Sequence, residues 1–205
     1  MGILKGALSV RRYRVDGELP EDWRESFREG LNASGFQENR SRTSKEERHG
    51  WVQYHNLLDT TFDDTTKWMY NHYLLFSMRV DKKTLPARLF RAHLDKRVQG
   101  WCEENKRERC PASVKTELKE ALELEMLAQT LPRVAVHEAC WNTNEGWVLF
   151  HNGSDLVNDS FRKLFMRTFG MTPYLHDPLD YLGATPGLAE TLLSTGASDL
   201  RGDGA

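Results

Sequence analysis

The sequence predicts an α+β protein in which an antiparallel sheet is packed by helices and an αα-hairpin is added to the core. Three observations lead to this prediction. Apolar residues alternate in strand-like stretches near both ends of the chain, two helical patterns follow one another in its middle, and no internal repeat of fixed period is visible. With 205 residues, 39% of them apolar, the chain can bury one substantial core. We therefore expect one domain with an appendage.

Residues 1–83 supply the N-terminal part of the α+β core. Leu8 and Val10 alternate within residues 6–15, which predicts a half-buried strand with a basic end. Residues 21–31 follow with an amphipathic helical pattern and acidic residues in the first turn. The apolar positions of this helix are four residues apart: Trp23, Phe27 and Leu31.

Two more extended segments are expected before residue 83. Residues 50–52 begin a short strand, and residues 57–67, rich in Thr and Asp, are predicted to form a loop. The strongest strand pattern covers residues 70–80. Its alternation places six side chains on one face: Tyr70, His72, Leu74, Phe76, Met78 and Val80.

The middle segment, residues 84–131, is predicted to form two consecutive helices. Residues 85–104 and residues 113–130 carry apolar side chains at steps of three and four, with a polar link and Pro111 between them. The first helix has a basic surface. The second is apolar on more than one side of its C-terminal half, because Met126, Leu127 and Leu131 lie off its main stripe. Such a helix needs a second covering partner besides the core.

Residues 132–181 complete the core. Two β-rich runs at 133–141 and 147–151 flank a turn-forming sequence and predict a β-hairpin. A last amphipathic helix is expected over residues 154–168, with Ser154 as its cap. Residues 182–205 are rich in Gly, Ser, Asp and Ala and are expected to form a flexible tail.

The composition bounds the location and the redox state of the protein. The apolar runs are too short to cross a bilayer and no secretory signal precedes the first strand, so we expect a cytoplasmic protein without a membrane partner. Cys102, Cys110 and Cys140 are odd in number and form no CxxC pair, which favours reduced thiols. A mixed metal site that adds His137 to these cysteines is a less favoured alternative, and we expect no metal and no cofactor.

Catalytic motifs are not apparent. The sequence has no phosphate-cradling glycine loop, no GxSxG elbow and no HExxH helix, so no enzymatic activity is expected. A metal-dependent nuclease is the alternative, since several carboxylates are clustered. These are Asp59, Asp63 and Asp64 in a loop, and Asp155 and Asp159 in the last helix.

The positive charge is concentrated in the middle of the chain. The overall formal charge is −2, yet residues 79–133 carry 13 basic against 9 acidic side chains, and residues 134–205 carry 4 against 9. A local basic segment on an acidic chain binds a polyanion if the fold gathers it on one surface. The predicted helix over residues 85–104 carries part of this charge.

The order of the segments resembles one known family. The series ILKGALSVRRYRV, EDWRESFREGLNASGF, LLFSMRVDKKTLP, RLFRAHLDKRVQGW, VKTELKEALELEMLAQ, LPRVAV and FRKLFMRTFG is similar to RdgC, the recombination-associated DNA-binding proteins. The resemblance covers about residues 3–181. It implies a non-sequence-specific protein that dimerises around or along duplex DNA, limits access of the strand-exchange recombinase, and is associated with the nucleoid.

The resemblance also assigns residues to these roles. The helical pair over residues 84–131 corresponds to a protruding tip where two subunits meet. The implied DNA-binding residues are Arg11, Arg12, Arg14, Arg79, Lys82, Lys83, Arg88, Arg91, Lys96 and Arg97. The implied dimer interface consists of Leu118, Leu122, Met126, Leu127, Leu131 and Arg133.

This sequence departs from the family at two places. It is expected to lack most of the C-terminal part that builds a second dimer contact, which leaves a closed ring or an open pair as alternatives. Where members continue with an aromatic residue after LPR, this chain has Ala135 after Val134. A second hypothesis is therefore a protein-interaction module on the same fold that has lost its affinity for DNA.

Overall fold

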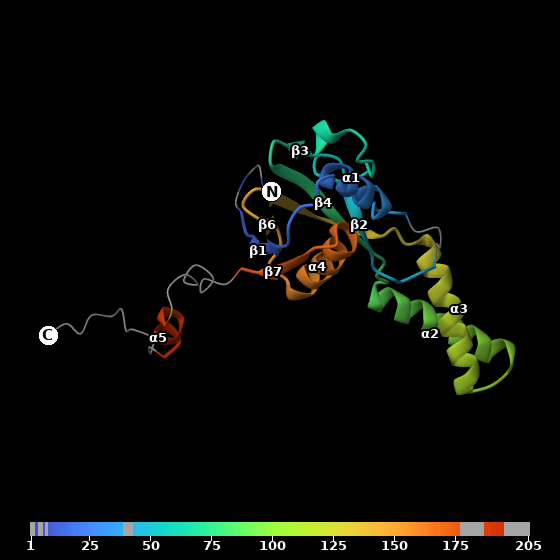
Figure 1. Cartoon of the computed structure of the whole chain (residues 1–205). Coiled ribbons are helices and arrows are strands. Elements are labelled where there is room, and N and C mark those ends of the chain that lie inside the picture. Colours follow the sequence, from blue (N-terminus) through green and yellow to red (C-terminus); the bar gives the residue numbers. More distant parts are fainter. Residues whose placement is uncertain (1–2, 4–5, 7, 39–42, 177–186, 195–205) are drawn as a thin grey trace.

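The computed structural model describes residues 3, 6, 8–38, 43–176 and 187–194. A seven-stranded antiparallel sheet forms its centre (Figure 1). Its strands are β1 (Arg11–Asp16), β2 (Arg48–Gln53), β3 (Met69–Tyr70), β4 (Tyr73–Lys82), β5 (Arg133–Asn142), β6 (Trp147–Phe150) and β7 (Thr172–Leu175). The helices are α1 (Trp23–Ala33), α2 (Ala87–Glu104), α3 (Ala112–Gln129), α4 (Asp155–Phe169) and α5 (Leu188–Ser194), with a 3₁₀ turn, η1, at Thr65–Lys67.

The strands follow the order β2-β4-β5-β6-β1-β7, with β3 paired to β4. Every strand pair is antiparallel. The predicted α+β class with an antiparallel sheet packed by helices is therefore confirmed. The predicted C-terminal tail lies largely outside the described residues, and α5 is the part of it that the structure describes.

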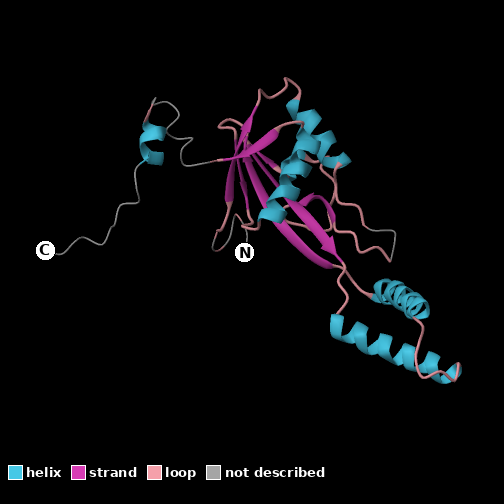
Figure 2. Ribbon diagram, turned by 90° about the horizontal axis from the view of Figure 1, so that it is seen from below, coloured by secondary structure: helices cyan, strands magenta, loops and turns pink. Residues whose placement is uncertain are grey.

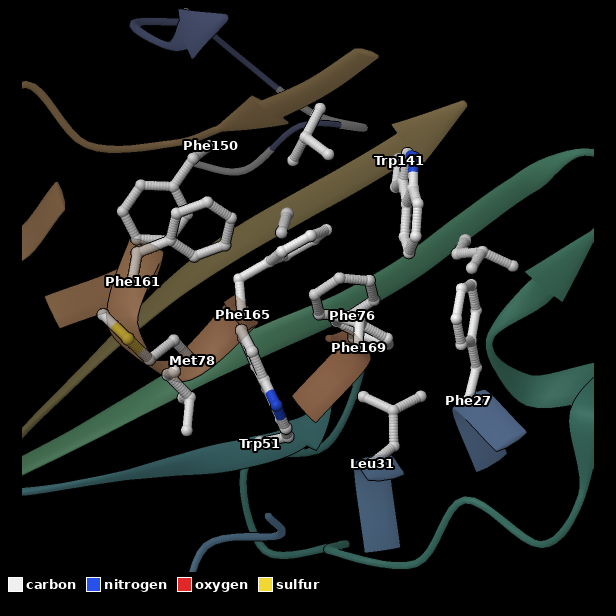
Figure 3. Packing of buried hydrophobic residues seen from close by; sticks show 14 of the residues in the cluster. Phe27, Leu31, Trp51, Phe76, Met78, Trp141, Phe150, Phe161, Phe165 and Phe169 are labelled. Carbon is white, nitrogen blue, oxygen red and sulfur yellow. The ribbon is translucent and has the colours of Figure 1, made fainter. Parts of the chain in front are cut away.

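One face of the sheet is covered by α1 and α4 (Figure 2). The core between them is aromatic: Phe27 and Leu31 from α1 and Phe161, Phe165 and Phe169 from α4 pack on the sheet (Figure 3). Trp51 of β2 is fully buried there, and its Nε1 donates a 2.7 Å hydrogen bond to Thr168 Oγ1. A buried indole N–H requires such an acceptor, so Thr168 fixes the position of Trp51.

A glycine allows α1 and α4 to approach closely. A Cβ atom at Gly30 of α1 would lie 2.3 Å from the backbone oxygen of Thr168 in α4. No side chain fits this space, which explains a glycine in the interior of a helix where it otherwise weakens the helix.

The strand predicted over residues 70–80 is divided by a turn. Asn71 has a positive φ of 55° and begins a two-residue turn between Tyr70 of β3 and Tyr73 of β4. Asn tolerates this left-handed conformation, as short hairpin turns require. Tyr70 and His72 therefore do not belong to the predicted face, whereas Leu74, Phe76, Met78 and Val80 face the core as expected.

The helices α2 and α3 are inserted between two paired strands. β4 and β5 pair along their whole length, from Tyr73–Asn142 to Lys82–Arg133. In the sequence, α2 and α3 lie between Lys82, where β4 ends, and Arg133, where β5 begins. Figures 1 and 2 show them projecting from one end of the sheet. In the described part of the chain, each packs extensively only against the other. We call residues 84–131 the tip.

Candidate nucleic-acid interface

The outer surface of α2 carries three exposed cations, Arg88, Arg91 and Lys96. None of them forms an ion pair with a described residue, and Arg88 and Arg91 line one shallow hollow together with Asp95. The apolar side chains of the helix occupy its other side and are only partly buried: Phe90, Leu94, Val98 and Trp101. The structure therefore keeps these three charges in solvent, where a polyanion can reach them.

Two further predicted cations hold the tip together. A guanidinium nitrogen of Arg97 in α2 pairs with Glu125 in α3. Lys83, which follows β4, donates from Nζ to the carbonyl oxygen of Leu127 at 2.9 Å. A cation is favourable at this position because the C-terminal end of a helix carries a partial negative charge.

Lys82 lies at the end of β4 beside Arg133 of β5. Its Nζ is 3.1 Å from Glu47 Oε2, and Glu47 Oε1 is 3.0 Å from His49 Nε2. The hydrogen bond from Lys82 lowers the pKa of Glu47; burial opposes this effect and the contact with His49 adds to it. Lys82 is still half-exposed, so it retains solvent access next to the tip.

Arg79 has a structural environment. It is 6% exposed, its guanidinium binds both carboxylate oxygens of Asp81 at 2.8 and 2.7 Å, and it donates to the carbonyl of Leu57 at 3.2 Å. Its guanidinium carbon also lies 4.2 Å from the centre of the Phe36 ring. A phosphate cannot reach a group enclosed in this way, so we exclude Arg79 from the candidate interface.

The three arginines of β1 lie far from the tip and on two faces. Arg11 pairs with Asp155 at 2.6 Å on the helix-covered face, whereas Arg12 lies over Trp147 and Arg14 pairs with Asp16 at 2.8 Å on the other. β1 is three strands from β4, about 14 Å across the sheet. Through the registers, Arg11 is level with Phe76, about 20 Å along the sheet from Lys82. The structure does not bring these arginines together with the tip cations.

The predicted dimer residues also fall into two groups: some are already buried within their own chain, and others remain exposed. Leu122 and Leu127 are 3% and 2% exposed and are already covered by their own chain. Leu118 and Met126 are partly buried. Leu131 is 87% exposed, and Arg133 is also exposed. Only the last two are fully available to a second molecule.

The sequence analysis missed other exposed groups on the tip. Leu89 and Leu124, which the sequence analysis did not assign to an interface, are apolar and about half-exposed. The link between α2 and α3 exposes three cations: Lys106, Arg107 and Arg109. The sequence feature that could have revealed these three cations is the excess of basic over acidic side chains within residues 79–133, which is not limited to the first helix.

The clustered carboxylates have local partners. Asp59 accepts from Thr61 Oγ1 at 2.7 Å and pairs with Lys67 at 3.2 Å, and Asp64 accepts from Thr66 at the start of η1. Hydrogen bonds from these threonines are the main reason that the pKa values of Asp59 and Asp64 are lowered. Among the described residues, no three His, Cys, Asp or Glu side chains are placed to hold a metal ion.

The cysteines and His137 are dispersed. Cys102 and Cys110 lie in the tip, whereas His137 and Cys140 lie on β5. Burial raises the pKa of Cys140 to about 11, which keeps its thiol protonated, and lowers the pKa of His137. Within the described ranges, no helix is both long and apolar enough to span a bilayer.

The fold and the tip define the class of this protein: an α+β protein whose central antiparallel sheet carries a helical hairpin, with exposed cations on its first helix, between two paired strands. The chain belongs to the RdgC family, because the family model described as "Putative exonuclease, RdgC" matches residues 9–180. The match includes the whole sheet and the tip. A search of curated proteins finds no match.

Proposed function

We propose that this protein is an RdgC-like, non-sequence-specific DNA-binding protein that binds the phosphate backbone through the outer surface of α2. The observation that carries the proposal is the exposure of Arg88, Arg91 and Lys96 without ion-pair partners in the described chain, on a helix that projects from the sheet. Unpaired guanidinium and ammonium groups bind phosphates and release counterions, and they read no base sequence.

The environment of the other predicted cations restricts the interface. Lys82 joins it with half of its side chain exposed, while Lys83 and Arg97 act within the tip by holding α3. Arg133, next to Lys82, extends the surface onto β5. The interface is thus centred on the tip and the adjoining end of the sheet.

Dimerisation through the tip is the second part of the proposal. An 18-residue helix without a single buried residue, α2, leaves much of its apolar surface in water. Leu89, Leu124 and Leu131 add further exposed apolar area to the tip. Burial of such area stabilises association by about 25 cal/mol per Å² before the costs of ordering are subtracted. A second copy would double the cations that face one DNA segment.

Such a protein would modulate homologous recombination by occupying duplex DNA, and membership of the RdgC family supports this part of the proposal. The test is a mobility-shift titration with unrelated duplexes of equal length. Arg88→Gln/Arg91→Gln/Lys96→Gln should weaken binding to all of them. The matched control removes two exposed arginines and one exposed lysine outside the tip, Arg14→Gln/Arg24→Gln/Lys163→Gln, and should bind nearly as wild type. Equal losses in both triple variants would contradict an interface on α2.

A protein-interaction module is the second candidate, favoured by the exposed leucines of the tip. Reversal of Arg88, Arg91 and Lys96 to glutamate separates the two functions, because DNA binding would be lost while capture of a protein partner through the apolar surface would survive. The exonuclease in the family description is tested by incubating end-labelled duplex with Mg²⁺ or Mn²⁺. We expect the labelled duplex to stay intact. Shortened products would instead support exonuclease activity and contradict a function in binding alone.

A further inference from the structure

The segment between β6 and α4 contains an asparagine followed by glycine, Asn152–Gly153, and no other asparagine in the sequence precedes a glycine. This step belongs to neither a helix nor a strand, Gly153 is exposed, and Asn152 is partly exposed. A Cβ atom at Gly153 would meet no atom within 4 Å. The backbone nitrogen after an asparagine can attack the side-chain amide carbon, and glycine, which has no Cβ, hinders this attack least. Asn152 is therefore the asparagine with the least hindered following nitrogen.

The side-chain amide of Asn152 is held at both ends. Its Oδ1 accepts from the backbone N–H of Ser154 at 2.7 Å. Because this bond identifies the oxygen of the amide, the atom that lies 3.0 Å from Nδ1 of His137 is Nδ2, which donates to the imidazole. Burial lowers the pKa of His137, which keeps the imidazole neutral, as its role as acceptor requires. The amide oxygen is thus directed at a backbone donor.

The hydrogen bond from Ser154 also favours a reaction at this amide. Attack of the Gly153 nitrogen on Cγ of Asn152 moves negative charge onto Oδ1, and a donor that already points at this oxygen stabilises the charge. The nearest described charges offset each other, because Arg11 donates to the Gly153 carbonyl at 2.7 Å and also pairs with Asp155 at 2.6 Å. The Ser154 N–H is therefore the group that acts on the developing oxyanion.

We propose that Asn152 is a site of spontaneous deamidation, in which the Gly153 nitrogen closes a succinimide ring with the assistance of the Ser154 N–H. The Gly153 nitrogen forms a bond to Asn152 Cγ, and its proton passes to water. The Cγ–Nδ2 bond breaks, and the nitrogen takes a proton from water and leaves as ammonia. Water then opens the ring at one of its two carbonyls, which gives aspartate or isoaspartate. Water is the only co-reactant.

Isoaspartate at this position would disturb a buried network. The main-chain carbonyl of Asn152 accepts from Asn158 Nδ2 at 2.9 Å, and Asn158 is 1% exposed. Asn158 Oδ1 in turn accepts from the hydroxyl of Tyr13 at 2.6 Å. In isoaspartate the main chain runs through the former side chain, and the former main-chain carbonyl becomes a carboxylate. Because the acceptor of a buried donor is then displaced, the deamidated chain should be less stable. This chemistry does not depend on the proposed DNA-binding function.

Ageing of the full-length chain at neutral pH tests the proposal, with mass-spectrometric peptide mapping that separates the asparagine, aspartate and isoaspartate forms. Asn152 should convert much faster than Asn32, which precedes an alanine within α1. The amide of Asn32 is also held at both ends, by the N–H of Phe62 and by Asp63, so it is a matched internal control. Gly153→Ala has open space for its Cβ and should keep the fold. It should slow conversion roughly tenfold, because the Cβ hinders the approach of the nitrogen to Cγ.

Two variants at Ser154 isolate the backbone donor. Ser154→Pro removes the N–H at a φ of −74°, which proline adopts, whereas Ser154→Ala keeps the N–H and removes a hydroxyl that makes no capping hydrogen bond. Conversion should slow severalfold in the proline variant only.

Thermal unfolding of fresh and aged samples measures the consequence. Aged wild type should lose several degrees of Tm, whereas Gly153→Ala, aged for the same time, should lose little. Conversion of Asn152 no faster than that of Asn32, an unchanged rate in Gly153→Ala, or equal rates in the two Ser154 variants would overturn the proposal. An unchanged Tm in converted wild type would contradict the disturbance of Asn158.

Discussion

Arg79 and Asp81 lie two residues apart on one face of β4 and form a bidentate ion pair, with Nε–Oδ1 at 2.8 Å and Nη2–Oδ2 at 2.7 Å. Their side chains are only 7% and 12% exposed. The pair lies one residue before the cations that lead into the tip. Arg79 therefore has a structural role, whereas Lys82, the residue after the pair, keeps half of its side chain in solvent.

Removal of one partner of this pair should be costly. Asp81→Ala leaves a buried guanidinium without its counter-ion, and we expect a loss of about 3–5 kcal/mol in the free energy of unfolding, measured by urea titration. Arg79→Met/Asp81→Leu removes both charges and should recover most of this loss. A loss below about 1 kcal/mol in the single variant would show that the ion pair of Arg79 with Asp81 is not needed for the stability of the fold.

The contact between α1 and α4 makes a second prediction. Gly30→Ala places a Cβ atom 2.3 Å from Thr168 O and should destabilise the protein by about 1–3 kcal/mol, because backbone must move to admit it. Gly100→Ala is the matched control, since Gly100 also lies inside a helix but has no atom within 4 Å of its Cβ position. It should be neutral or stabilise by up to about 1 kcal/mol. Equal destabilisation by both variants would refute the close approach.

Glu47 should contribute to the acid sensitivity of the fold. Its pKa is lowered in the folded state by Lys82, against the effect of burial, so its contribution is present above the ordinary glutamate pKa of about 4.3 and is lost as the pH falls below it. Denaturant titrations of wild type and Glu47→Gln should therefore differ at pH 7 and converge toward pH 3. A difference that is independent of pH over this range would contradict the assigned interaction.

The tip leucines should govern self-association. Leu124→Ser/Leu131→Ser removes two exposed apolar side chains of the tip and should shift sedimentation velocity profiles from dimer to monomer. Leu58→Ser is the control, because Leu58 is 70% exposed but lies in a turn between β2 and η1, outside the tip. If the double variant sediments like wild type at every concentration, the tip is not the dimer contact.

Most of the fold was predictable because its signals are local. The alternation from Leu74 to Val80 and the helical spacing of α1 and α4 are direct consequences of which side chains face one core. The turn at Asn71 was missed because a two-residue turn leaves the apolar alternation on both sides unbroken. The aromatic pattern therefore looked like a single strand.

The candidate site was less predictable, because it depends on pairing between distant residues. Arg88 and Arg97 look alike in the sequence, yet only Arg97 meets a carboxylate, Glu125, on the next helix.

The most direct test is the affinity of the wild-type chain for a duplex of arbitrary sequence, measured by fluorescence anisotropy over a series of salt concentrations. The interface holds three unpaired cations on α2 together with Lys82 and Arg133. Log affinity should therefore fall with log salt with a slope of about −3 to −5 per subunit, and unrelated sequences should give the same line. Absence of binding at low salt, or an affinity that does not change with salt, would contradict the account.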